Sequence, residues 1–196
     1  DNVDFTAYKG EIHALLGENG AGKSTLMNIL TGVLRPDGGE ILINGARVSM
    51  KSPGDALALG IGMIYQHFKL VKPFTVAENI VLGMEQVKIL KKQALEQQVK
   101  ALSEEYKIDI NPASAIWQLS IGEQQRVEIL TAIYQGADIL ILDEPTAVLT
   151  PQETEVLFET LRHMKEDGKS IILITHKLEE IISIVDEVTV LRDGKL

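Results

Sequence analysis

The chain has 196 residues, of which 45% are hydrophobic and 24% charged, and it is long enough to form one well-packed domain. Its formal net charge of −9, with Lys and Arg scattered along the sequence, argues against a nucleic-acid partner, which usually meets a basic patch. The absence of cysteine excludes disulfides and thiolate metal sites. No apolar run approaches the ~18 residues of a membrane-spanning helix.

The first part of the sequence alternates short apolar runs with turn signals. Residues 11–16 predict a buried strand, which a glycine-rich turn connects to a helix that ends near Gly32. Turn residues at 36–39 and at 44–45 flank an apolar run and predict a small antiparallel β region. Residues 61–65 predict a further strand, which ends at Gln66.

Residues 74–118 have a different character, without long β-branched runs and with a strongly helix-forming, polar stretch at 90–106. We interpret them as a helical subdomain whose charged residues form a solvated face. From Ser120 onward, apolar runs at 139–142 and 171–175 alternate with a helical pattern near 154–164. This alternation predicts a parallel sheet with right-handed crossovers, and hence one α/β domain over residues 1–196.

The most specific motif lies at residues 17–25, where GENGAGKST matches G-x-x-x-x-G-K-[ST] after a predicted strand and at the start of a helix. Its glycines let backbone N–H groups wrap around phosphate, and the helix N-terminus adds positive potential. This context disfavours the alternative of a strand-to-helix turn without a ligand. We predict a phosphate site of Gly17, Glu18, Asn19, Gly20, Ala21, Gly22, Lys23, Ser24 and Thr25.

Within this site, two side chains have distinct predicted roles. Lys23 would reach the β- and γ-phosphates of a nucleoside triphosphate, and the Ser24 hydroxyl would coordinate Mg²⁺. Asp143 and Glu144 follow the apolar run 139–142, and an acid at the end of a buried strand suits the same metal. Asp143 would hold Mg²⁺, and Glu144 would activate the attacking water as general base. An acidic strand end before a turn is the alternative.

Three further polar residues follow predicted strands or begin a helix. His176 ends the run 171–175, where it could hydrogen-bond the γ-phosphate or the attacking water. The Gln66 amide could reach Mg²⁺ or the water, and Ser120 is a plausible helix N-cap. The residues alone do not say whether this second helix N-terminus binds a phosphate. We assign structural roles to the other histidines, His13, His67 and His163.

In this order, the five motifs resemble the ATP-binding domain of an ABC transporter over essentially the whole chain. GENGAGKST resembles Walker A, Gln66 the Q-loop residue, LSIGEQQ the signature, ILILDE Walker B, and His176 the switch histidine. The stretches LSIGEQQRVEIL and DEPTAVLTPQE are similar to the first ATP-binding half of sugar and nucleoside importers. The resemblance implies a P-loop NTPase (RecA-like) core that hydrolyses ATP with Mg²⁺ to power an importer.

The resemblance also implies partners and roles. In the family, two domains meet head to tail, and each nucleotide touches one P-loop and the other domain's signature, here Ser120 and Gly122. The partners would be a second ATP-binding domain, as homodimer or fused half, and transmembrane permease subunits at the cytoplasmic face of the membrane. The catalytic residues would be Glu144, His176, Lys23 and Gln66, and the metal ligands Ser24, Gln66 and Asp143.

The sequence departs from the family pattern at the signature, where Ile121 and Glu123 replace Gly and Gln, and at Thr150, where the family has Asp. Thr150 keeps open the alternative of a regulatory half that binds ATP with little turnover. The short stretch between His67 and Leu119 excludes the coiled-coil insertion of chromosome-maintenance ATPases, whereas soluble translation-factor relatives remain an alternative. The aromatic that stacks on adenine normally precedes such a start, so we expect a fragment that lacks an N-terminal strand.

Overall fold

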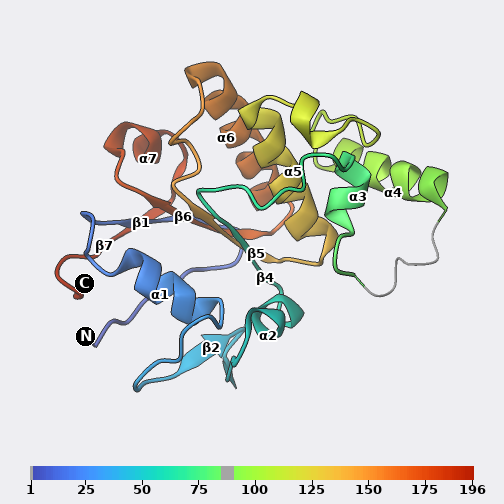
Figure 1. Cartoon of the computed structure of the whole chain (residues 1–196). Coiled ribbons are helices and arrows are strands. Elements are labelled where there is room, and N and C mark those ends of the chain that lie inside the picture. The colour runs from blue at the N-terminus through green and yellow to red at the C-terminus, as the bar shows by residue number, and fades with distance from the viewer. Residues whose placement is uncertain (1, 85–90) are drawn as a thin grey trace.

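The computed structural model describes residues 2–84 and 91–196, and a parallel sheet of five strands forms its centre (Figure 1). The strands are β1 (Ile12–Leu16), β4 (Ile61–Ile64), β5 (Ile139–Asp143), β6 (Ser170–Thr175) and β7 (Glu187–Val190). They lie in the order β4-β5-β6-β1-β7, and every pairing is parallel. The predicted α/β fold class is thereby confirmed. Because helices cover both faces of the sheet, its strands are apolar on both sides, which is why they stand out as apolar runs in the sequence.

Alternate residues of β5 show how the two faces are covered. Leu140 and Leu142 pack into a core with α3 (Val76–Ile80), α4 (Lys92–Glu105), α5 (Ile121–Tyr134) and α6 (Pro151–Glu166). Ile141 packs on the opposite face with Met27 of α1 (Lys23–Leu30) and Ala56 of α2 (Pro53–Ala58). Figure 1 accordingly shows α1 and α5 on opposite sides of the sheet. A helix α7 (Leu178–Ile184) leads from β6 to β7.

The predicted antiparallel β region is a hairpin of β2 (Ile41–Ile43) and β3 (Ala46–Val48). Its two-residue turn places Asn44 at φ 51° and Gly45 at φ 77°, which are the positive values that a tight hairpin turn requires. Residues 74–118 contain α3, α4 and the short 3₁₀ helix η2 (Ile116–Gln118), while residues 85–90 lie outside the described part. Whether this stretch is a subdomain of its own remains a prediction.

None of the helices in the described ranges is long and apolar enough to span a membrane. Their limits follow local signals that the sequence contains. Ser120 caps α5 and Thr150 caps α6, each accepting a hydrogen bond from the backbone N–H three residues later. The helix α1 ends before Gly32, which has φ 70°, as predicted for a residue just beyond a helix C-terminus.

Gly62 on β4 allows α5 to pack closely on the sheet. A Cβ atom at this position would lie 2.9 Å from the Ala137 Cβ and 3.1 Å from the Ala132 Cβ. We expect Gly62→Ala to lower the free energy of unfolding by about 1–3 kcal/mol, the usual cost of overpacking a core, as measured by urea denaturation. Gly38→Ala is the control, because a Cβ there meets no atom within 4 Å. Equal losses in the two variants would contradict this account of the packing.

Candidate functional site

The carboxyl ends of four neighbouring strands meet at one edge of the sheet. The register pairs Asp143 at the end of β5 with Ile174, and Leu16 at the end of β1 with Thr175 at the end of β6. Parallel strands end at the same edge, which is where open α/β sheets bind ligands. The residues that follow the strands therefore line up in the strand order, as Gln66, then Asp143 and Glu144, then His176, then the loop that begins at Gly17.

The loop from Gly17 to Gly22 connects β1 to α1 and has a backbone that requires glycine. Gly20 has φ 87° and Gly22, directly before α1, has φ 105°. The buried Lys23 side chain folds back over this loop, with Nζ donating to the Gly17 carbonyl at 2.7 Å and to the Glu18 carbonyl at 3.1 Å. The ammonium group is thus held at the loop by two neutral carbonyl oxygens, while Ser24 lies exposed in the first turn of α1.

The segment after β7 packs against the Gly17–Gly22 loop, a contact that the sequence did not predict. A Cβ on Gly17 would come within 2.4 Å of the Leu191 carbonyl oxygen, so this position has no room for a side chain. The Leu191 N–H donates to Leu16 O at 2.7 Å, and the Gly194 N–H donates to Ala21 O at 3.0 Å. The only local signal for this contact was a turn sequence at 192–195, which does not reveal its partner.

Glu144 is held in an unusual conformation directly after β5. Its φ of 48° lies in the left-handed region, which costs a non-glycine residue about 1–3 kcal/mol. Its N–H donates to Ile174 O at 2.8 Å, and its Oε1 lies 2.8 Å from His176 Nδ1. The other carboxylate oxygen, Oε2, is buried and has no hydrogen-bond partner within the described ranges. An unpaired buried acceptor is costly, and it is suited to bind a water molecule or its proton.

Asp143, at the end of β5, is an acid with a raised pKa at this edge. Burial raises its pKa above the ordinary value, the neighbouring Glu144 charge raises it further, and Lys23 lowers it in part. The described residues contain no cluster of three or more acidic or histidine side chains that could hold a metal ion alone. The hydroxyl, carboxylate and amide oxygens of Ser24, Asp143 and Gln66 are nonetheless the type that Mg²⁺ takes together with phosphate oxygens and water.

Gln66 lies two residues beyond the end of β4, and its side chain is exposed. It makes no hydrogen bond to any described residue, so the structure places it at the same edge as Asp143 without joining the two side chains. His13 and His163 have protein partners. His13 is buried between Glu11 Oε1 at 2.8 Å and Thr189 Oγ1 at 2.7 Å, which fits the predicted structural role. His163 approaches a glutamate at 3.3 Å, and His67 is exposed.

The N-terminus of α5 already holds two carboxylates. Glu123 closes a capping box, in which the Ser120 N–H donates to its Oε2 at 2.7 Å. Glu153 of α6 reaches across, and its Oε1 accepts from the Gly122 N–H at 3.1 Å. The pKa of Glu153 lies below its ordinary value, chiefly because the Thr150 N–H donates to its carboxylate. The hydrogen bond from the Gly122 N–H lowers this pKa further. Since α5 and α1 lie on opposite faces of the sheet, one chain does not bring Gly122 to the phosphate position beside Lys23.

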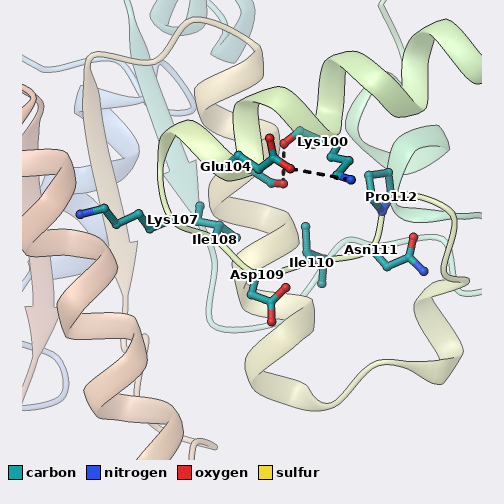
Figure 2. Close-up of a pocket in the computed structure, with 9 residues that line it drawn as sticks. Lys100, Glu104, Lys107, Ile108, Asp109, Ile110, Asn111 and Pro112 are labelled. Atoms are coloured by element: carbon teal, nitrogen blue, oxygen red, sulfur yellow. Dashed lines mark hydrogen bonds and ion pairs between the residues drawn. The ribbon is translucent and has the colours of Figure 1, made fainter.

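A hollow of about 460 Å³ lies elsewhere, between the end of α4 and the segment that follows it (Figure 2). Lys100 and Glu104 form an ion pair of 3.8 Å on its rim, and Figure 2 shows Lys107 pointing away from both. None of the predicted site residues lines it, and Figure 1 places α4 across the molecule from α1. This hollow is therefore not part of the site at the sheet edge.

The raised pKa of Asp143 predicts a pH-dependent effect on stability. The folded chain binds the proton more tightly than the unfolded chain, so the free energy of unfolding falls as the pH rises through this titration. We expect Asp143→Asn to raise the melting temperature at pH 7, and the difference from the parent to shrink as the pH falls towards the ordinary value of 3.8. The exposed Asp37→Asn is the control. A lower melting temperature for Asp143→Asn at pH 7 would refute the argument.

Comparison with known proteins agrees with this geometry. Residues 1–147 match the family model described as ABC transporter. The chain is 54% identical over 197 residues to the nucleoside import ATP-binding protein NupA of Lactococcus lactis, covering 100% of this chain and 39% of the relative. It is 47% identical over 197 residues to the ribose import ATP-binding protein RbsA 1 of Streptomyces avermitilis, covering 100% and 38%.

Among solved structures, the chain resembles a dimeric post-hydrolysis state of the ATP-binding cassette MJ0796 bound to ADP and Pi. The TM-score is 0.81 at 25% identity, covering 100% of this chain and 87% of that one. The chain spans about two fifths of the length of the curated relatives named above, 39% and 38%. The family match over most of the chain, the identity to the relatives over the whole of this chain and the P-loop NTPase fold agree. This chain belongs to the ABC transporter family.

Proposed function

We propose that this chain is the ATP-binding and ATP-hydrolysing domain of an ABC importer, with ATP and Mg²⁺ as its ligands. The observation that carries the proposal is the Glu144 carboxylate at the sheet edge that also bears the Gly17–Thr25 loop. One of its oxygens contacts His176, and the other has no hydrogen-bond partner among residues 2–84 and 91–196. The names of the relatives support sugars or nucleosides as the transported class.

The phosphates would bind at the Gly17–Thr25 loop, where the Lys23 ammonium group is held. Lys23 exchanges two neutral carbonyl partners for negatively charged phosphate oxygens, which are much stronger acceptors. Ser24, Gln66 and Asp143 would hold Mg²⁺, which neutralises phosphate charge when bound. A cation beside Asp143 would also offset the repulsion from Glu144 that raises its pKa. In the chain without ligands, the Asp143 carboxylate is therefore buried beside another negative charge, and a bound Mg²⁺ would stabilise it.

Glu144 would act as the general base. Its Oε1 is fixed by His176 Nδ1, so the proton of an attacking water would pass to Oε2, which has no other described partner. The left-handed backbone at φ 48° holds the carboxylate in this position. His176 is 60% exposed, and its second nitrogen, Nε2, would be available to a phosphate oxygen. The two residues thus combine proton transfer with orientation.

Completion of the site would require a second ATP-binding domain in a head-to-tail arrangement, either a second copy or a fused half. The Ser120 and Gly122 end of α5 supports this, because it already receives the Glu153 carboxylate and so has donors arranged for an anion. In one chain this end lies on the other face of the sheet from α1. A phosphate held by a partner's loop would take the place of that carboxylate.

The partner that receives the motion would be a transmembrane permease, with this domain peripheral at the cytoplasmic face of the membrane. The segment between β4 and α3, which contains Gln66, is called the Gln66 segment. Two exposed aromatic side chains near its end support such docking, since Trp117 is 65% and Phe74 is 40% exposed. The Trp117 N–H donates to Lys72 O at 3.2 Å. The backbone that carries Trp117 is therefore hydrogen-bonded to the segment that follows Gln66.

A regulatory half that binds ATP with little turnover is the second candidate, and Thr150 is the observation that favours it. Thr150 occupies the position where the family has Asp, and its side chain is engaged in capping α6, with Glu153 as its partner. A residue committed to a helix cap offers less to a neighbouring domain than a free carboxylate would. Measured turnover distinguishes the two candidates.

We expect Glu144→Gln to retain ATP binding and to lower turnover by about 10²–10⁴-fold, the usual contribution of a general base. The measurement is Mg-ATP hydrolysis against protein concentration, with nucleotide binding followed separately. The parent rate should rise faster than linearly with concentration if two domains assemble. Glu159→Gln, an exposed change on α6, is the control. Equal turnover in Glu144→Gln and in the parent would contradict the general-base role of Glu144. A parent that binds ATP without hydrolysing it would favour the regulatory half.

The docking proposal predicts a separation of basal from stimulated turnover. In the full-length protein reconstituted with its permease, we expect Trp117→Ala to leave basal hydrolysis unchanged and to abolish stimulation by transported substrate, because an exposed anchor is lost. Leu42→Ala, also an exposed apolar side chain at 55%, is the control on the β2–β3 hairpin. Full stimulation in Trp117→Ala would rule out this surface as the docking site.

A further inference from the structure

The segment between β4 and α3 contains Gln66 but has no regular structure, so side chains from two helices hold it. The Lys69 N–H donates to Glu128 Oε1 of α5 at 2.8 Å. The Val71 N–H donates to Asn79 Oδ1 of α3 at 2.7 Å, and Asn79 Nδ2 donates back to Val71 O at 3.2 Å. The Trp117 N–H also donates to Lys72 O at 3.2 Å, so the contact of Lys69 with Glu128 is one of several that hold this segment, and it is the one that comes from α5.

The first attachment, at Lys69, lies three residues from Gln66 along the chain. Lys69 Nζ lies 3.5 Å from the centroid of the Tyr65 ring, a cation–π contact that closes the loop around Gln66. Lys69 therefore ties together both sides of the loop, through its side chain to Tyr65 and through its N–H to Glu128.

Glu128 stands on the helix that begins at the second predicted phosphate site. It follows Ser120 by two turns on α5, a distance of roughly 12 Å along a continuous helix. Burial raises the pKa of this half-buried carboxyl, so its placement carries a cost, and its main described compensation is the Lys69 N–H. Through this hydrogen bond, Glu128 connects the middle of α5 to the backbone of the segment that contains Gln66.

We propose that Glu128 is a positioning residue that links the Gln66 segment to the N-terminus of α5, so that a ligand contacted by Gln66 shifts Ser120 and Gly122. The inference rests on the proposed function. In a head-to-tail pair, Gln66 serves the nucleotide of its own chain, whereas Ser120 and Gly122 serve the nucleotide of the partner. The link through Glu128 then makes occupancy of one nucleotide site favour closure of the other.

The test compares Glu128→Ala, which removes the acceptor, with Glu128→Gln, whose amide oxygen keeps an acceptor for the Lys69 N–H. In the full-length protein, we expect Glu128→Ala to bind ATP as the parent does, to lose about five- to tenfold in turnover at saturating ATP, and to lose cooperativity in ATP. Glu128→Gln should restore both turnover and cooperativity. Glu96→Ala, a helix glutamate paired with Lys92, is the matched control.

Amide hydrogen exchange separates this link from a purely structural role and from failure of the proposed function. This readout does not require turnover. On addition of Mg-ATP, we expect the amide exchange rates to change at residues 66–72 and at 121–125 in the parent, but only at 66–72 in Glu128→Ala. The proposal is overturned if both regions respond in Glu128→Ala, or if Glu128→Gln is impaired as much as Glu128→Ala. It is also overturned if the alanine variant simply melts at a lower temperature with normal cooperativity.

Discussion

The parallel pairing of β4, β5, β6 and β1 is the constraint on which the rest of the molecule depends. Because the four strands run in one direction, their carboxyl ends reach the same edge of the sheet. Residues from positions 17, 66, 143 and 176 meet there only through this pairing. The pairing is stabilised by apolar side chains on both faces, so the same alternation that builds the two cores positions the site.

The site contains several costs that the cores must offset. Glu144 has a left-handed backbone and one unpaired buried oxygen, and Asp143 has a raised pKa beside it. Such strain persists where the surrounding structure holds it in place, and it is common at functional sites. On the proposed function, groups of the protein also occupy positions meant for phosphate. Carbonyls satisfy Lys23, and the Glu153 carboxylate satisfies Gly122.

The helix α5 connects these features. Its apolar residues Val127, Ile129 and Leu130 are fully buried in the larger core. Its N-terminus presents Ser120 and Gly122, and its middle turn holds the Gln66 segment through Glu128. On the proposed link through Glu128, a shift of the Gln66 segment would reach the N-terminus of α5 through this helix.

The sequence by itself determined the features that depend on neighbouring residues. These include the glycine-rich loop, the strands recognised as apolar runs, the helix cap at Ser120, and the hairpin turn at 44–45, because each follows from local backbone preferences. It also placed the acids and His176 at strand ends. Only the tertiary structure decided which of these residues touch. The contacts of Glu144 with His176, Glu153 with Gly122, and Glu128 with Lys69 join residues separated by 32, 31 and 59 positions. No local preference specifies such contacts, since they arise from how the helices pack against the sheet.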